Sequence, residues 1–415
     1  MALTIIEDFA KLQLTNVYDP VILSSTLMAS AGMRYVLDVS GTLGSARLKC
    51  DPVPDTKYGF FGINRIVETL FVRSVPQIVS AWQTGRWAVK ANLTYREEYP
   101  NQTISSGLIT GSIFAVQGHA GYADAVVALG NGFPYIITGS TGAVGDIVFS
   151  NRPTQRSLLF TTPEYIHAVV DPALVSGIQV RVRYYDNAGT VARTFYVTRS
   201  GTTESNIINV GGQALFNLTA GECSDGQNGA ANFPPQGGYY DYQLVADSAG
   251  VVTGRKRSQE FRVYLKTIQS GLSVNNVCSG TIYENNTGHN MVLMFQNEYG
   301  SFDTYEFTMK RRTSVNAERE QIRRNVDVYG FQNWIENNSV MFQYSYELNT
   351  DWLLDSEWTW LMELITSPRV YMHVATIGWM PIILQNNSYI INRRINDNLR
   401  QLNITALSGE KIATI

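Results

Sequence analysis

The clearest structural signal in the chain is Ile178-Gln179-Val180-Arg181-Val182-Arg183-Tyr184, in which apolar and polar side chains alternate. This period of two is typical of a β-strand with one buried face. The next residues, Asp186-Asn187-Ala188-Gly189, tolerate turn conformations, and apolar alternation returns over 191–197. The sequence therefore predicts a β-hairpin over residues 178–197.

Two further segments carry the same pattern. Residues 240–245 are followed by the turn Asp247-Ser248-Ala249-Gly250 and by a strand that begins at Val251. Residues 33–39 and 46–49 flank a Gly-containing turn at 41–44. We therefore predict a mainly β fold, made of several small β-sandwich-like or β-barrel-like domains with a few short helices.

Changes in composition and pattern along the chain predict four domains. Residues 1–90 form a β domain with one amphipathic helix over 63–71, and residues 91–150 form a Gly-rich β segment. Residues 151–268 form a sandwich of immunoglobulin or fibronectin type. Residues 269–415 form an α+β domain with a Trp-rich helix.

The composition excludes several classes of protein. Of the 415 residues, 44% are hydrophobic and only 16% are charged, and the formal net charge is −3. Disorder and nucleic-acid binding driven by bulk charge are therefore not expected. The shortage of charge favours buried subunit contacts. Three scattered cysteines, no signal peptide and no apolar run long enough to cross a bilayer predict free thiols and synthesis in a host cytoplasm.

No constellation of residues predicts catalysis or a cofactor. The four histidines are scattered, so core or surface positions are expected and a metal site is not. Residues 139–146 resemble a phosphate loop but lack its Gly-Lys-Ser/Thr ending. Glu97 and Glu98, and the acidic residues from 351 to 357, are interpreted as structural. We therefore do not expect an enzyme.

Two polar segments leave alternatives open. The basic segment 310–324 contains Arg311 and Arg312; it contacts an acidic neighbour or nucleic acid, or is a strand followed by a solvated loop. The Gly-rich loop 221–238 contacts a partner, or is less ordered than its flanking strands.

Residues 355–366 are predicted to form a helix that stops at Ser367-Pro368. Trp358, Leu361, Met362 and Ile365 share one face, whereas Trp360 and Leu364 point to another side. The second side is buried between two layers of the domain or is covered by a partner. The candidate interface residues are therefore Trp360, Leu364, Trp358, Arg311 and Arg312.

The chain resembles virion proteins of tailed phages that infect Bacteroidota, including crAss-like phages. The motifs that carry the resemblance occur in order along the chain: Tyr35–Leu48, Asp51-Pro52, Gly59–Ile66, Ser150–Thr154, Phe295–Phe307, Lys310–Arg319, Asp355–Trp358 with Leu361, Leu364, Ser367 and Pro368, Trp379–Leu384, Ser388-Tyr389 and Asn396–Asn398. The resemblance implies a structural component of the tail, neck or collar without catalytic residues.

The expected function is accordingly a phage structural protein that forms a symmetric homo-oligomeric ring in the tail, neck or baseplate region. Other virion tail or neck proteins are the expected partners, and the virion is the expected location. Two alternatives remain open. A receptor- or carbohydrate-binding tail module would present aromatic residues on one exposed face. A tail-associated hydrolase would need paired carboxylates or a metal cluster.

Overall fold

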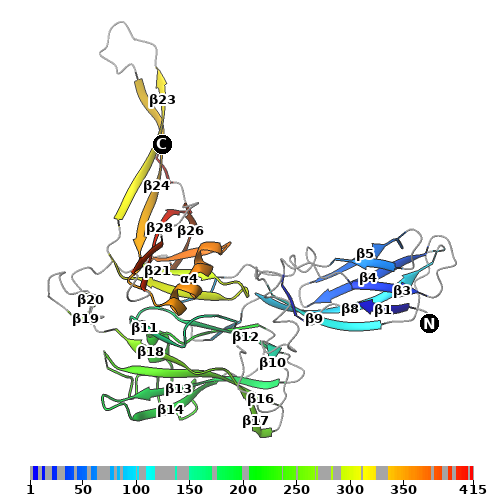
Figure 1. The fold of residues 1–415 in the computed structure, drawn as a ribbon, viewed down its shortest axis with the longest axis horizontal. Helices are drawn as coiled ribbons and strands as arrows, with labels where there is room; N and C mark the ends of the chain where they lie inside the picture. Colours follow the sequence, from blue (N-terminus) through cyan, green and yellow to red (C-terminus); the bar gives the residue numbers. More distant parts are fainter. Residues whose placement is uncertain are drawn as a thin grey trace. The chain divides into compact units, whose positions relative to one another are not determined.

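A computed structural model of the chain confirms a mainly β fold, with antiparallel sheets and two helices among the described residues (Figure 1). The chain forms two compact units, residues 1–265 with 297–302 and residues 266–296 with 303–415. The structure describes residues 3–7, 12–14, 21–25, 33–41, 44–53, 58–62, 75–78, 82–84, 87–99, 101, 109–116, 136–137, 149–170, 175–198, 205–235, 237–248, 251–266, 268–269, 282–283, 291–309, 312–323, 335–374, 378–385, 391–394, 399–409 and 412–414.

The N-terminal part of the first unit contains two sheets. One has the strand order β1-β3-β6 and the other β2-β9-β8-β4-β5. Their bounds are β1 Leu3–Glu7, β2 Leu12–Leu14, β3 Val21–Ser25, β4 Arg34–Gly41, β5 Gly44–Cys50, β6 Tyr58–Phe61, β8 Ala88–Glu98 and β9 Ile109–Val116. The β4–β5 hairpin confirms the predicted pairing, with Val39 opposite Ala46.

A close approach of backbone to side chain marks the core of this part. A Cβ atom placed on Gly59 of β6 would lie 2.2 Å from the Tyr35 ring of β4, so only glycine fits at this position. Tyr35, Leu37 and Tyr95 are fully buried. The predicted domain boundary at residue 90 falls inside β8, which pairs with β4 and β9. The predicted helix over 63–71 lies outside the described residues.

The rest of the first unit is a two-sheet sandwich, as the alternation over 178–197 predicts. One sheet has the order β10-β12-β15-β7 and the other β11-β18-β16-β13-β14, with β17 paired to β16. Their bounds are β7 Trp82–Thr84, β10 Ile136–Ile137, β11 Gln155–Leu158, β12 Tyr165–Val170, β13 Val175–Tyr185, β14 Val191–Thr198, β15 Ser205–Asn209, β16 Tyr239–Ser248, β17 Val251–Arg257 and β18 Phe261–Leu265, with the short helix α3 Gly212–Phe216.

The core of the sandwich follows from the alternation of β13. Ile178, Val180 and Val182 are fully buried, whereas Gln179, Arg181 and Arg183 alternate with them on the outer face. Each such side chain contributes roughly 1.5–3 kcal/mol through burial. The predicted hairpins are confirmed, with Val182 opposite Phe195 and Ser248 opposite Val251.

The second unit contains a short parallel pair, β19-β20, and a nine-stranded sheet. The sheet order is β22-β21-β25-β26-β28-β24-β23, with β27 paired to β28 and β29 paired to β24. The bounds are β19 Ile268–Gln269, β20 Ile282–Tyr283, β21 Met291–Gln296, β22 Phe302–Phe307, β23 Arg312–Arg323, β24 Ile335–Asn349, β25 Val370–Val374, β26 Gly378–Leu384, β27 Ile391–Arg394, β28 Leu399–Ser408 and β29 Ile412–Thr414.

Helix α4 spans Asp355–Thr366, as the sequence predicts. The Glu357 carboxylate accepts the Leu354 backbone N–H at 3.1 Å, which satisfies one donor of the first turn. Ser367 is extended and precedes Pro368, so the helix ends where the pre-proline restriction requires. Within the described residues, no helix is long and apolar enough to cross a membrane.

Candidate assembly surface

Strands β23 and β24 form a long hairpin that extends beyond the other strands of its sheet (Figure 1). β24 pairs with β28 over residues 345–349 and with β29 over residues 340–342. In the described part of the chain, residues 335–339 pair with β23 alone. We call residues 312–323 and 335–344 the arm. The arm is two-stranded at 335–339 and is joined by β29 at 340–342. A ribbon of two or three strands has little burial of its own, so the faces of the arm are available for contact.

One face of the arm is apolar. The register places Val315 opposite Tyr344 and Ala317 opposite Phe342, and the next pair on this face, nearer the tip, is Arg319 opposite Val340. We call Val315, Ala317, Val340, Phe342 and Tyr344 the apolar face of the arm; Arg319 borders it. Val315 is 54% exposed and Tyr344 is 37% exposed.

This face continues the core side of the sheet. Phe342, Tyr344 and Tyr346 lie on one side of β24, with ring centroids 5.8 and 6.4 Å apart. Tyr346 packs against the core, and Leu348, two residues further, is fully buried. Among the described residues, the apolar side that the core covers at the base of β24 is therefore only partly covered along the arm.

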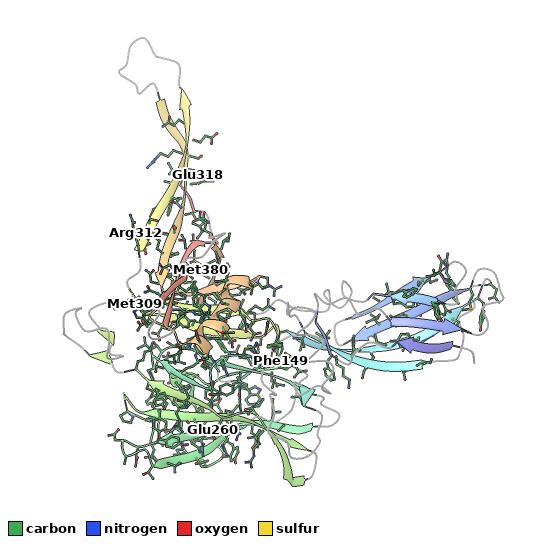
Figure 2. All side chains as sticks on the ribbon, in the orientation of Figure 1. Phe149, Glu260, Met309, Arg312, Glu318 and Met380 are labelled. Atoms are coloured by element: carbon green, nitrogen blue, oxygen red, sulfur yellow. The ribbon has the colours of Figure 1, made fainter. Side chains whose placement is uncertain are left out.

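The opposite face of the arm is mainly polar. It carries Arg312, Glu318 and Glu320 on β23, together with Met341 on β24. Figure 2 shows the side chains of Arg312 and Glu318 at separate points along β23. All described side chains of residues 312–321 are exposed. The arm is therefore amphipathic, and the predicted solvated loop after Arg312 is corrected to a strand that continues to Arg323.

The structure corrects the prediction that Trp360 and Leu364 form a partner-facing side of α4. Trp360 is 2% exposed, and its indole N–H donates to the Asp303 carboxylate at 2.9 Å. Leu364 is completely buried in the same core as Trp358. Both sides of the helix are covered within its own unit, which is the other alternative that the sequence left open.

The remaining candidate residues fall into different environments. Trp358 is buried, and the guanidinium of Arg400 lies 5.6 Å from its ring centroid. Arg312 is exposed on the arm and lies 3.9 Å from Glu347. Arg311 lies outside the described residues. Of the predicted interface residues that the structure describes, Arg312 alone therefore belongs to the candidate surface.

Hydrogen bonds hold the loop 221–238 on the sandwich. This contrasts with the prediction that the loop is less ordered than its flanking strands. The buried guanidinium of Arg193 makes two hydrogen bonds to the Asp225 carboxylate, at 2.7 and 2.9 Å. It also donates to the backbone carbonyls of Gln227, Asn228 and Ala231. The Arg193 side chain therefore supplies the fixed contacts that the Gly-rich composition does not.

The loop also approaches the sandwich backbone closely. A Cβ atom on Gly229 would lie 1.8 Å from the Leu215 carbonyl oxygen, so this position requires glycine. The Gly229 N–H donates to Leu218, and the Tyr184 hydroxyl donates to the Gly229 carbonyl. The loop is thus a structural part of the domain.

Replacing Arg193 by methionine is expected to release the loop, because four backbone or carboxylate partners lose their donor. Breaking a buried charge pair typically costs about 3–5 kcal/mol. Hydrogen exchange on the full chain should show faster exchange at the amides of residues 224–229. Arg47→Met provides the control, since the Arg47–Asp38 pair lies in a more exposed part of another sheet.

The same pair predicts an acid-dependent loss of stability. Hydrogen bonds from Arg193 lower the pKa of Asp225 below its ordinary value of 3.8. The stability that comes from this lowered pKa is therefore present above about pH 4 and is lost as the pH falls through the folded-state value of Asp225.

For the Arg193→Met variant, unchanged hydrogen exchange at the amides of residues 224–229 would contradict the role of Arg193 in holding the loop.

An outer-face cluster on the sandwich bears on the carbohydrate-binding alternative. Tyr185 stacks on Tyr239 with ring centroids 4.4 Å apart, and Tyr239 lies 5.4 Å from Tyr264. The Arg262 guanidinium lies 4.6 Å from the Tyr239 ring centroid and binds Asp241. Burial raises the pKa of Asp241, but hydrogen bonds from Arg262 and Tyr185 hold it below its ordinary value. Tyr185 is 7% exposed, and the Tyr239 ring is in contact with Tyr185 and Arg262, so these two rings are engaged by neighbouring side chains.

His167, Glu97 and Glu98 make contacts within the fold. His167 is buried, and its Nδ1 accepts the Phe302 backbone N–H at 3.3 Å. Burial, with the nearby charge of Arg152, holds the pKa of His167 well below 6.5. Glu98 pairs with Lys49, and Glu97 accepts the Tyr99 hydroxyl. Among the described residues, no group of three or more metal-ligating side chains is gathered. His119, His289 and residues 139–146 lie outside the described residues.

Comparisons with known proteins add little to this geometry. No protein-family model matches the chain. None of the curated proteins compared with it matches either. Among solved structures, a chain in the C6-symmetric tail of an empty GTA particle matches with 14% identity and a TM-score of 0.22, covering 30% of this chain and 96% of that chain. A two-domain fibronectin type III segment of chicken tenascin matches with 11% identity and a TM-score of 0.20, covering 64% and 97%.

The calcium-binding domain CBD12 of CALX1.1 matches with 7% identity and a TM-score of 0.18, covering 64% of this chain and 100% of that chain. TM-scores this low do not establish a shared overall fold, so the function has to be inferred from the residues of the chain itself. Those residues define a mainly β protein with packed sheets and an amphipathic arm.

Proposed function

We propose that the chain is a structural, non-catalytic component of a tailed-phage virion. In this proposal, copies of the chain assemble with one another and with neighbouring virion proteins into a symmetric ring in the tail, neck or baseplate region. The observation that carries the proposal is the apolar face of the arm, where Val315 and Tyr344 are exposed side chains that continue a buried sheet face. The ordered motifs shared with phage virion proteins support the same class.

The physical argument for assembly is the cost of leaving this face in water. Large apolar and aromatic side chains are enriched at the centres of protein interfaces, where they are removed from solvent. The arm exposes several of them in one row, and the core covers none of them beyond Tyr346. A structural role needs such a surface and needs no catalytic group.

Replacing Tyr344 by lysine is expected to weaken assembly of the full chain by ~30-fold, which corresponds to about 2 kcal/mol at an interface hot spot. The monomer should keep its stability, because Tyr344 is already partly in solvent. Sedimentation velocity over a concentration series would measure the assembly, and denaturant unfolding would measure the stability.

Met341→Gln is the control, because an uncharged side chain does not compete for Glu318 on the neighbouring strand. Met341 lies on the same strand with a similar exposure, 40%, but on the polar face and opposite Glu318. It should assemble like the unmodified chain. Equal assembly by both variants, or equal loss in both, would show that the apolar face is not the contact surface.

A further inference from the structure

Strand β23 presents a long edge that the described strands do not cover. It is a terminal strand of the nine-stranded sheet, and its described partner is β24. Its 12 residues, Arg312–Arg323, contain neither proline nor glycine. Exposed edge strands of this length are templates for pairing with another strand, and proteins commonly block them with proline, bulges or charge. The charges of β23 lie at its start and over residues 318–323, so they decide which strand fits.

The charges along β23 have a directional order. Arg312 stands at the base of the arm, and Glu318 and Glu320 lie six and eight residues further on. Thr313, Ser314, Val315, Asn316 and Ala317 separate them without charge. Arg319, between the two glutamates, lies on the other face of the strand, opposite Val340. The face that carries Arg312, Glu318 and Glu320 therefore has a basic start and an acidic middle, and it is complementary to its own reverse, because antiparallel pairing brings the start of one copy opposite the middle of the other.

The apolar face restricts the possible registers. Residues directly opposite each other in an antiparallel pair project to the same side of the sheet. A shift by one residue would therefore join the apolar face of one arm to the polar face of the other. In an antiparallel pair of identical strands, the two-fold axis passes either through one residue or between two residues. Only registers in which the axis passes through a residue of β23, here called centred on that residue, keep Val315 and Ala317 of both copies on one side of the sheet.

Electrostatics then selects among these registers. When the pairing is centred on Val315, Arg312 of each copy lies opposite Glu318 of the other copy. When it is centred on Asn316, Arg312 of each copy lies opposite Glu320 of the other copy. Centres at Glu318, Arg319 or Glu320 place like charges directly opposite each other, which is destabilising. The centre at Ala317 brings no opposite charges together. Opposite charges therefore meet only when the pairing is centred at Val315 or Asn316.

We propose that β23 pairs antiparallel with β23 of a second copy of this chain, in a register centred on Val315 or Asn316. This inference rests on the self-assembly in the proposed function and names one of its contacts. A contact of this kind is two-fold symmetric, so a ring with more than two copies needs an additional head-to-tail contact.

Arg312 is available for this contact. Its described ion-pair partner is Glu347 of β24, at 3.9 Å, with 76% and 50% of the two side chains exposed. Exposed pairs of this length contribute little to stability. Pairing with a second copy would bring Arg312 opposite Glu318 or Glu320 twice in each contact. The second copy is thus the partner that the charge pattern favours.

Charge reversal tests the proposal in the full chain. Arg312→Glu alone, and Glu318→Arg with Glu320→Arg, should each weaken self-association about tenfold, because both changes create like pairs on both sides of the two-fold axis. The three substitutions together should restore association to within about threefold of the unmodified chain. Sedimentation equilibrium would measure the association constants, and denaturant unfolding would verify that each variant folds.

Cysteine substitution identifies the register. A residue on the two-fold axis faces its own copy at a Cα separation that a disulfide spans. Either Val315→Cys or Asn316→Cys should therefore form a disulfide with its own copy under mild oxidation, identified by mass spectrometry of the linked peptides. Ser339→Cys on β24 is the control and should form none.

The outcomes separate this inference from the proposed function. Restoration by the triple variant together with one self-linked position supports the edge pairing. Association that is unchanged in all charge variants, with Tyr344→Lys still impaired, overturns the edge pairing and leaves the proposed function standing. A chain that remains monomeric at all concentrations and forms neither self-linked product overturns both.

Discussion

Replacing Glu164 by glutamine is expected to lower the free energy of unfolding of the sandwich by about 3–5 kcal/mol, the typical cost of removing one partner from a buried ion pair. Glu164 is completely buried between two arginines, 3.0 Å from Arg152 and 2.8 Å from Arg156. Its carboxylate also accepts the Tyr242 hydroxyl. The glutamine side chain keeps the shape but removes the negative charge that the two buried arginines share.

Denaturant unfolding of the full chain measures this effect, with hydrogen exchange at β12 and β16 to assign it to the sandwich. Asp51→Asn is the control, because Asp51 pairs with Arg34 at the surface, where both side chains are more than half exposed. That variant should change stability by less than ~1 kcal/mol. A loss below ~1 kcal/mol in Glu164→Gln would contradict the role assigned to the buried cluster.

Replacing Trp360 by alanine is expected to destabilise the second unit by about 3–5 kcal/mol, as expected for a large aromatic side chain removed from a core. The ring lies 5.7 Å from the Phe295 ring and 6.0 Å from the Tyr305 ring, measured between centroids. Its removal also takes the indole donor away from the buried Asp303 carboxylate. Trp360→Ala should therefore unfold about as easily as Trp358→Ala.

Trp352→Ala is the matched control, since Trp352 is 42% exposed and should contribute less than ~1 kcal/mol. Denaturant midpoints of the three variants give the comparison. If Trp360→Ala kept normal stability while losing assembly, α4 would be an interface helix after all, and the buried position of Trp360 would be wrong.

Local signals in the sequence are sufficient for much of the fold. The β13–β14 and β4–β5 hairpins follow from alternation and turn residues that are close together in the chain. The bounds of α4 follow from Asp355 and Glu357 at its start and from Ser367-Pro368 at its end. These features depend on neighbouring residues, so no knowledge of the tertiary structure is needed to predict them.

The errors arise where distant residues meet. A helical wheel places Trp360 away from Trp358, but it does not reveal that β22 brings Asp303 and Tyr305 to that side. The order of loop 221–238 depends on Arg193, which is more than 30 residues from each of its partners. The amino-acid composition of such a loop, considered alone, indicates few stabilising contacts.

The arm is not predicted from the sequence for a related reason. Residues 312–323 are rich in charge, which favours a solvated loop when the segment is considered alone. Its strand conformation depends on pairing with 335–349, where Phe342, Tyr344 and Tyr346 alternate with polar or flexible residues. Val315 and Ala317 repeat the same alternation on β23, and this pair of matching patterns is the signal from which the amphipathic arm is predictable.

The central claim is that the chain is a virion structural protein that assembles through its arm. Electron cryomicroscopy of the assembled particle, with this chain located and its copies counted in the map, tests that claim most directly. We expect several symmetry-related copies in the tail, neck or baseplate region, with Val315 and Tyr344 of each arm covered by a neighbouring chain. A particle that lacks the chain, or arms whose apolar face remains in solvent, would contradict it.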